Sequence, residues 1–189
     1  MNIGIIAAED DEMLAIKNIM TDIKENKIYN LNFIQGTIKN KMCTLVKSGV
    51  GKVNAARTTQ VLIDNYKVDY VINVGSAGGI DEELNIEDIV IGNNLIQYDF
   101  DITQVGNYEK GEICEIGKYI KSDERLINLC IETIEEMKDR DFNIKIGTIG
   151  TADLFSADPN RASNLKKEFD IECVEMEGAA IAQVCLLDD

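Results

Sequence analysis

Carboxylates are the side chains of this protein with the clearest capacity for chemistry. The sequence contains no histidine, which excludes Ser-His and Cys-His nucleophiles and any zinc site that depends on imidazole. Proton transfer therefore falls to carboxylates. Glu175 and Glu177 flank Met176 directly before a run of small residues that predicts a helix. Such close carboxylates are costly unless something binds them, and a vicinal diol can donate hydrogen bonds to both oxygens of one carboxylate. The alternative, one buried helix cap and one solvated acid, stays open.

Acids also gather at residues 9–12, immediately after an apolar run at residues 2–8 that predicts a buried strand. The carboxyl ends of strands are where α/β folds place ligands. Acids are also favoured at the positive end of a helix dipole, and helix capping is the commoner explanation for any one of them. Glu12 becomes a candidate functional residue only in combination with residues elsewhere in the chain.

Two further segments could take part in ligand binding, but each is a weak signal when taken alone. Residues 75–79 read Gly-Ser-Ala-Gly-Gly after a predicted strand, which lets the backbone approach a ligand closely. They match neither a phosphate loop nor GxGxxG, and a tight strand-to-helix turn explains them equally well. Phe155 lies in a predicted loop, where its ring can stack on a planar base. A loop phenylalanine more often folds back onto the core.

Composition narrows the class of protein. The chain has 189 residues, is 45% apolar and carries a formal charge of −15, which suits one globular domain and disfavours nucleic acid or an anionic membrane as partner. No apolar run is long enough to span a bilayer, so we expect a soluble, cytoplasmic protein. The five cysteines form no CxxC pair, which favours reduced core thiols over a metal site or disulfides. We therefore expect no metal site.

The pattern along the chain predicts strands that alternate with helices and hence an α/β sheet covered on both faces, in a single domain over residues 1–189. A first helix is expected to carry Met13, Ile16, Met20 and Ile23 on one face. Ser122 is the expected N-cap of a later helix, and Asp158-Pro159 marks the start of another. Strands are expected at residues 2–8, 27–38, 42–47, 70–74, 88–98 and 144–149.

Taken together, these residues resemble the 5′-methylthioadenosine/S-adenosylhomocysteine nucleosidases of the purine nucleoside phosphorylase and uridine phosphorylase superfamily. No single segment is decisive, but the set follows the order and spacing of the family along nearly the whole chain. The matching segments are residues 3–8 with Glu12, 47–56, 73–79, 88–90, 98–103, 153–155 and 174–180.

The resemblance implies a nucleoside phosphorylase-like fold: three α/β/α layers around a central mixed, mostly parallel sheet. It also implies hydrolysis of the N-glycosidic bond of an adenine thionucleoside, which gives adenine and a thioribose. The family's hydrolases use no cofactor and usually act as homodimers, in which the loop after Thr103 contributes to the neighbour's pocket.

The resemblance also assigns roles to individual residues. Glu12 would polarise the attacking water as general base. Glu177 would bind the ribose hydroxyls, with Met176 against the sugar. The other implied substrate contacts are Val50 on the sugar side, Ser76, Ala77 and Gly78 beside the base and water, Phe155 stacked on adenine, the backbone of Ser156 at its edge, and Val174 and Glu175 completing the set.

Two features of the family pattern, an Arg on a late strand and a Ser-Asp pair after it, have no counterpart here, and both bear on activity. The family continues with a strand bearing an Arg, a Ser-Asp pair whose Asp protonates the leaving adenine, and a long helix. The only Ser-Asp pair here, at residues 122–123, precedes a different helix. We therefore expect a chain that lacks the last strand and helix, with weak or absent catalysis. The alternatives are an adenine-nucleoside-binding module without turnover and a nucleoside phosphorylase. The phosphorylase is disfavoured because it needs arginine forks to hold phosphate. The chain has only Arg57, Arg125, Arg140 and Arg161, and none of them lies in the segments expected to face a nucleophile.

Overall fold

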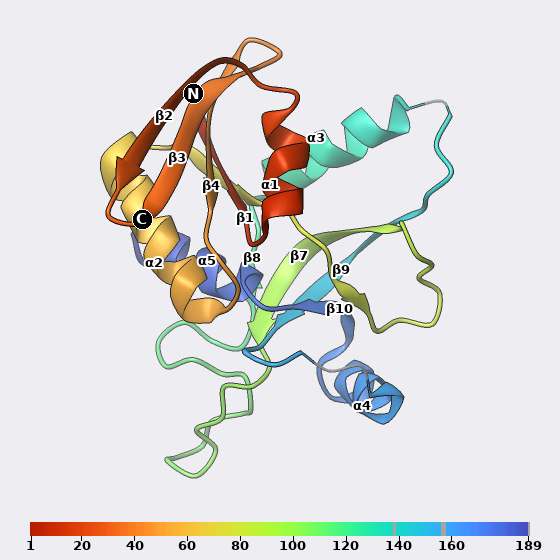
Figure 1. The fold of residues 1–189 in the computed structure, drawn as a ribbon. Coiled ribbons are helices and arrows are strands. Elements are labelled where there is room, and N and C mark those ends of the chain that lie inside the picture. Colours follow the sequence, from red (N-terminus) through yellow and green to blue (C-terminus); the bar gives the residue numbers. More distant parts are fainter. Residues whose placement is uncertain (138, 156–157, 189) are drawn as a thin grey trace. The chain divides into compact units, whose positions relative to one another are not determined.

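The computed structural model describes residues 1–137, 139–155 and 158–188, and the side chains of residues 159–161 are outside the description. The chain divides into two compact units (Figure 1). Unit 1 comprises Met1–Ser76 and the chain from Gln183 onward, and unit 2 comprises Ala77–Ala182. The sequence of helix α5 (Gly178–Leu187) includes residues assigned to each unit.

Unit 1 contains a five-stranded mixed sheet. The central strand β1 pairs in parallel with β4 and β5, whereas β3 pairs antiparallel with β4 and β2. The strands follow one another across the sheet in the order β2 (Thr21–Ile28), β3 (Leu31–Ile38), β4 (Lys41–Lys47), β1 (Asn2–Ala7) and β5 (Tyr70–Asn73). Helices α1 (Asp10–Lys17) and α2 (Lys52–Tyr66) both contact β1 and β4.

The apolar pattern of unit 1 explains how its helices pack. Met13 and Ile16 of α1 lie against a buried cluster that includes Ile5, Ile34 and Leu45. Helix α2 buries Ala55, Thr59 and Leu62, which recur at helical spacing on one face. It lies so close to β1 that a Cβ atom at Gly4 would be 2.6 Å from the Leu62 Cδ2 atom. This tight packing holds the carboxyl end of β1, and with it the start of α1, in a defined place.

Unit 2 contains a second five-stranded mixed sheet. Its three middle strands are parallel, and a short antiparallel strand lies at each edge. The strand order is β6 (Gly78–Gly79), β10 (Ile171–Glu175), β9 (Ile144–Thr151), β7 (Ile89–Gln97) and β8 (Ile120–Lys121). Helix α3 (Glu124–Glu135) contacts β7, and α4 (Pro159–Phe169) contacts β10. The core beneath α4 contains Ile96, Tyr98, Leu165, Phe169 and Ile171.

The structure confirms the α/β fold class. The described strands form two mixed sheets. Each of these sheets has two parallel and two antiparallel pairings, so parallel pairing does not predominate. None of the helices in the described residues has the length and apolar character that crossing a bilayer requires.

Two local expectations are wrong, each for a physical reason. The first helix ends at Lys17, and Ile23 belongs to strand β2. Asp22 has φ of 54°, which no helix tolerates, and β2 obtains its hydrogen bonds from β3 as an exposed edge strand. The N-cap of α3 is Asp123 instead of Ser122, because the Asp123 carboxylate accepts hydrogen bonds from the Arg125 and Leu126 backbone N–H groups. The predicted start of α4 at Pro159 is confirmed.

Candidate active site

Glu12 in unit 1 is held by four hydrogen bonds. Its Oε2 atom accepts from the backbone N–H groups of Ala8, at 2.9 Å, and Glu9, at 3.1 Å. Its Oε1 atom accepts from the backbone N–H of Ser76, at 2.9 Å, and from the Ser76 hydroxyl, at 3.2 Å. The capping explanation of this acid is therefore correct, since Glu12 closes a capping box at the start of α1. The same carboxylate also joins the end of β1 to the loop after β5.

These contacts fix the charge of Glu12. Burial by itself raises the pKa of this carboxyl group, but the hydrogen bonds from Ser76, Glu9 and Ala8 outweigh burial and leave the pKa below its usual value. Glu12 is therefore ionised at neutral pH. An ionised, half-buried carboxylate held by donors on both oxygens can accept a proton from a water molecule without changing its position.

Gly75 is required by the position of Glu12. A Cβ atom at residue 75 would lie 2.8 Å from the Glu12 Oε1 atom, closer than a carbon can approach. The glycine thus allows the loop backbone to approach the Glu12 carboxylate closely. Val50, another predicted residue, lies exposed between β4 and α2. Its carbonyl oxygen accepts a hydrogen bond from the Asn54 side chain, at 2.7 Å.

Glu175 in unit 2 is turned toward the start of α5. Its Oε2 atom accepts hydrogen bonds from the backbone N–H groups of Glu177, at 2.8 Å, and Gly178, at 2.6 Å. Its Oε1 atom accepts a hydrogen bond from the Thr151 hydroxyl, and the Thr151 oxygen in turn accepts from the Ala179 N–H at 2.8 Å. Glu175 is therefore a half-buried helix cap, which corresponds to one half of the alternative that the sequence left open.

Thr151 is a residue that sequence reasoning missed. It is the last residue of β9 and is fully buried. Burial raises the pKa of Glu175, although the Thr151 hydroxyl and the two backbone N–H groups act in the opposite direction. The sequence signal is slight, because nothing distinguishes Thr151 from Thr148 in the same strand until the pairing of β9 with β10 is known.

Glu177 and Met176 follow at the junction between β10 and α5. Glu177 is only 7% exposed, so the expectation of a solvated acid in its place is wrong. Its carbonyl oxygen accepts hydrogen bonds from the Ala180 and Ile181 N–H groups in the first turn of α5. Met176 is half-buried. Glu175 is thus committed to the helix start, and the binding of a diol by Glu177 stays a prediction.

The other predicted residues of unit 2 lie on two segments. Gly78 in β6 pairs with Val174 in β10, and Ala77 precedes it on an exposed stretch. Phe155 is 87% exposed, so the ring is not folded back onto the core. Ser156 lies outside the described residues. The structure thus brings Glu12 together with Ser76 in unit 1, and in unit 2 it brings Gly78 together with Val174 and Glu175 together with Glu177.

A hollow of about 450 Å³ in unit 2 is separate from these residues. None of the described candidate residues lines it, so it does not define the active site. Its lining residues are Tyr98, Asp99, Lys110, Asp158, Asn164, Leu165 and Glu168.

The described ranges contain no cluster of three or more Cys, Asp or Glu side chains that could hold a metal ion. Of the five cysteines, Cys43 and Cys173 are buried, whereas Cys114 and Cys130 are exposed, so the expectation of core thiols holds only in part.

Comparison with known proteins identifies the class to which this fold and site belong. Residues 2–187 match the family model of the phosphorylase superfamily. Among curated relatives, the 5′-methylthioadenosine/S-adenosylhomocysteine nucleosidase of Bacillus velezensis is 39% identical over 98% of this chain and 79% of that protein. The chain belongs to the 5′-methylthioadenosine/S-adenosylhomocysteine nucleosidase family within that superfamily.

Solved structures agree with this assignment. The nucleosidase of the same name from Colwellia psychrerythraea, in complex with adenine, superposes with a TM-score of 0.93 at 36% identity, over 99% of this chain and 77% of that one. Futalosine hydrolase of Helicobacter pylori superposes equally well, with a TM-score of 0.93 at 31% identity, over all of this chain and 79% of that one. The fold alone therefore does not select between these two named substrates.

Proposed function

We propose that this protein hydrolyses the N-glycosidic bond of 5′-methylthioadenosine and S-adenosylhomocysteine, releasing adenine and a thioribose. The observation that carries the proposal is the ionised Glu12 carboxylate, held by Ala8, Glu9 and Ser76. It is supported by family membership and by the adenine bound to the Colwellia relative. The weak or absent catalysis expected from the sequence is the alternative that the assay below tests.

In the proposed reaction, the oxygen of a water molecule attacks C1′ of the ribose while the bond from C1′ to the adenine nitrogen breaks. Glu12 accepts the proton that the water loses, and the leaving adenine takes up a proton from solvent or from another group. The transition state carries positive charge on the sugar, which carboxylates stabilise. Water activated by a carboxylate requires no cation, which separates this reaction from phosphorolysis.

The substrate contacts are proposed as follows. The Glu177 carboxylate accepts hydrogen bonds from the ribose hydroxyls, and Met176 packs against the sugar. The exposed ring of Phe155 has a free face for stacking on adenine. Glu175 acts through the helix start that it caps. The remaining proposed contacts are Val50, Ser76, Ala77, Gly78, Val174 and the backbone of Ser156.

We also propose that residues 1–189 act as one nucleosidase domain, without a cofactor, and as a homodimer. The proposed site of action is the cytoplasm. The formal charge of −15 supports a small-molecule substrate over a nucleic acid or an anionic membrane surface.

The direct test is adenine release, measured by chromatography, from methylthioadenosine, S-adenosylhomocysteine and futalosine in buffers with and without phosphate. Release from the first two in phosphate-free buffer supports the proposal. A rate that depends on phosphate identifies a phosphorylase. Nucleoside binding by calorimetry without release identifies a binding module. Cleavage of futalosine alone identifies the function named for the Helicobacter relative.

A further inference from the structure

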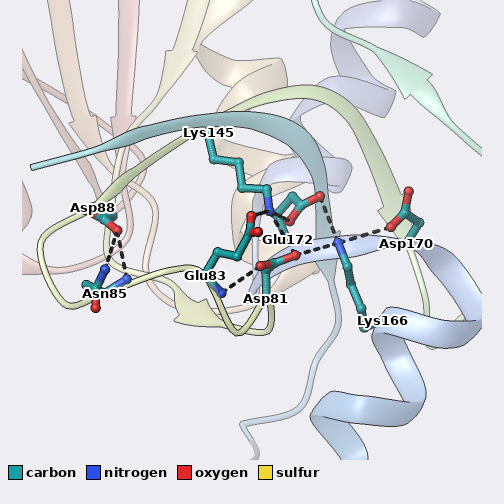
Figure 2. Close-up of polar contacts among 8 residues, drawn as sticks. All are labelled: Asp81, Glu83, Asn85, Asp88, Lys145, Lys166, Asp170 and Glu172. Carbon is teal, nitrogen blue, oxygen red and sulfur yellow. Dashed lines mark hydrogen bonds and ion pairs between the residues drawn. The ribbon is translucent and has the colours of Figure 1, made fainter.

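Unit 2 contains a closed ring of alternating charges that the proposed reaction does not use (Figure 2). The Asp81 Oδ2 atom lies 2.9 Å from the Nζ atoms of both Lys145 and Lys166. Glu172 completes the ring, with Oε1 at 2.9 Å from Lys166 and Oε2 at 3.2 Å from Lys145. We call Asp81, Lys145, Glu172 and Lys166 the ion ring. The two carboxylates are almost buried, with 11% and 9% of their side chains exposed.

The ion ring joins four elements of unit 2. Asp81 follows β6, Lys145 lies at the start of β9, Lys166 lies in α4 and Glu172 lies at the start of β10. Ion pairs at this degree of burial lose much of their net contribution to stability because of desolvation. They do, however, penalise any arrangement that leaves one charge unpaired. The ring is therefore better suited to selecting one arrangement of these elements than to adding stability.

Glu172 is also the point at which the pairing of β10 with β9 shifts. Ile171 faces Thr148 and Cys173 faces Ile149, so Glu172 is an extra residue that forms a bulge. In an unbroken register Val174 would face Thr151, and Glu175 would lie beyond the end of β9. With the bulge, Glu175 faces Thr151, which is the contact that caps α5.

Two further contacts hold this bulge. The Glu172 carbonyl oxygen accepts hydrogen bonds from the Ile80 N–H, at 2.8 Å, and the Asp81 N–H, at 3.1 Å. The Glu172 side chain passes over Gly147 so closely that a Cβ atom there would collide with the Glu172 Cγ atom. A one-residue slip in a strand turns every following side chain to the opposite face. The bulge therefore decides where Glu175 and the residues after it are placed.

We propose that Glu172, held by the ion ring, is a positioning residue that sets the register of β10 and thereby places the substrate-binding segment at residues 174–177. Its role in binding rests on the function proposed above, whereas its role in register does not. The relevant variant is Glu172→Gln, which keeps the shape of the side chain and removes its charge. Glu83→Gln and Asp170→Asn are matched controls. Each removes a carboxylate that pairs with a ring lysine but is more than four-fifths exposed.

The first readout is hydrogen exchange of the Glu177, Gly178 and Ala179 amides, which donate to Glu175 and Thr151. We expect exchange in Glu172→Gln to be about ten-fold faster at these amides, beyond any change in global unfolding, and unchanged in both controls. The second readout is calorimetric affinity for methylthioadenosine on a Glu12→Gln background, which prevents turnover. Because a small misplacement of a binding group costs up to about 10²-fold, we expect affinity to fall about ten-fold or more.

The outcomes separate the two proposals. Unchanged exchange at the three amides in Glu172→Gln, or an equal change in the two controls, overturns the positioning role. Faster exchange in Glu172→Gln, in a protein that binds no nucleoside even with native Glu172, supports the register role and overturns the proposed function. If Glu172→Gln does not fold, Lys166→Gln tests the same point, because it opens the ion ring but leaves the pair between Glu172 and Lys145 in place.

Discussion

Replacing Thr151 with valine removes one buried and one part-buried hydrogen bond with little change in the volume of the side chain. The Thr151 hydroxyl donates to Glu175, and its oxygen accepts from the Ala179 N–H. Thr151 is fully buried, so the substitution leaves the buried Ala179 N–H and a half-buried Glu175 carboxylate oxygen without these partners. Each buried group left unsatisfied costs about 1–3 kcal/mol. We expect the free energy of unfolding to fall by about 2–5 kcal/mol, a large share of the stability of a typical domain.

Thr44→Val is the matched control for this prediction. Thr44 is also fully buried in a strand, but its hydroxyl has no hydrogen-bond partner among the described residues. Removing that hydroxyl relieves a desolvation cost. We expect Thr44→Val to be neutral or to stabilise the protein by about 1 kcal/mol.

Urea unfolding of the two variants at neutral pH is the assay, with the slope of the transition compared to confirm that the same surface is exposed. Affinity for methylthioadenosine is expected to fall in Thr151→Val, because the capped helix start places Glu177. Equal losses of stability in both variants, or no loss in Thr151→Val, would refute the view that Thr151 supports Glu175.

Three further predictions follow from the same contacts. Gly75→Ala forces a Cβ atom against the Glu12 carboxylate, so adenine release should fall about 10–10²-fold with little change in the unfolding midpoint; unchanged release would refute it. The pKa of Glu12 is lowered and that of Glu175 is raised. The stability lost in Glu12→Gln should therefore shrink as pH falls below about 4.3, whereas Glu175→Gln should become relatively more stable as pH rises above that value; parallel pH profiles in urea would contradict this. Burial raises the pKa of Cys173 to about 12, so iodoacetamide at pH 8 should alkylate the exposed Cys114 and leave Cys173 unmodified until unfolding, as mass spectrometry can check.

Much of the fold follows from local sequence signals. The buried face of α2 and the start of α4 were predictable, because helix spacing and the Asp158-Pro159 pair act over a few residues. Strand β2 was not predictable, since every residue from Thr21 to Lys27 is exposed and no apolar alternation marks it. Its hydrogen bonds come from β3, and tertiary pairing of this kind overrides local preference.

The candidate site, like the fold, was predictable from the sequence only in part. Glu12 was predictable as a cap, and it makes the capping contacts as expected; its role as a base stays a prediction. Glu175 and Glu177 were identified as a pair, but their separate positions depend on Thr151 and on the bulge at Glu172. Both depend on how two strands distant in sequence align, which no local pattern encodes.

The most direct test of the proposed reaction compares adenine release from methylthioadenosine by the native chain and by Glu12→Gln in phosphate-free buffer. As general base, Glu12 should contribute about 10²–10⁴-fold to the rate. We predict that Glu12→Gln loses turnover by that factor while its calorimetric affinity for the nucleoside stays within a few-fold of native, a split that marks a catalytic group. Turnover in Glu12→Gln at the native rate would contradict the central claim that this carboxylate activates the attacking water.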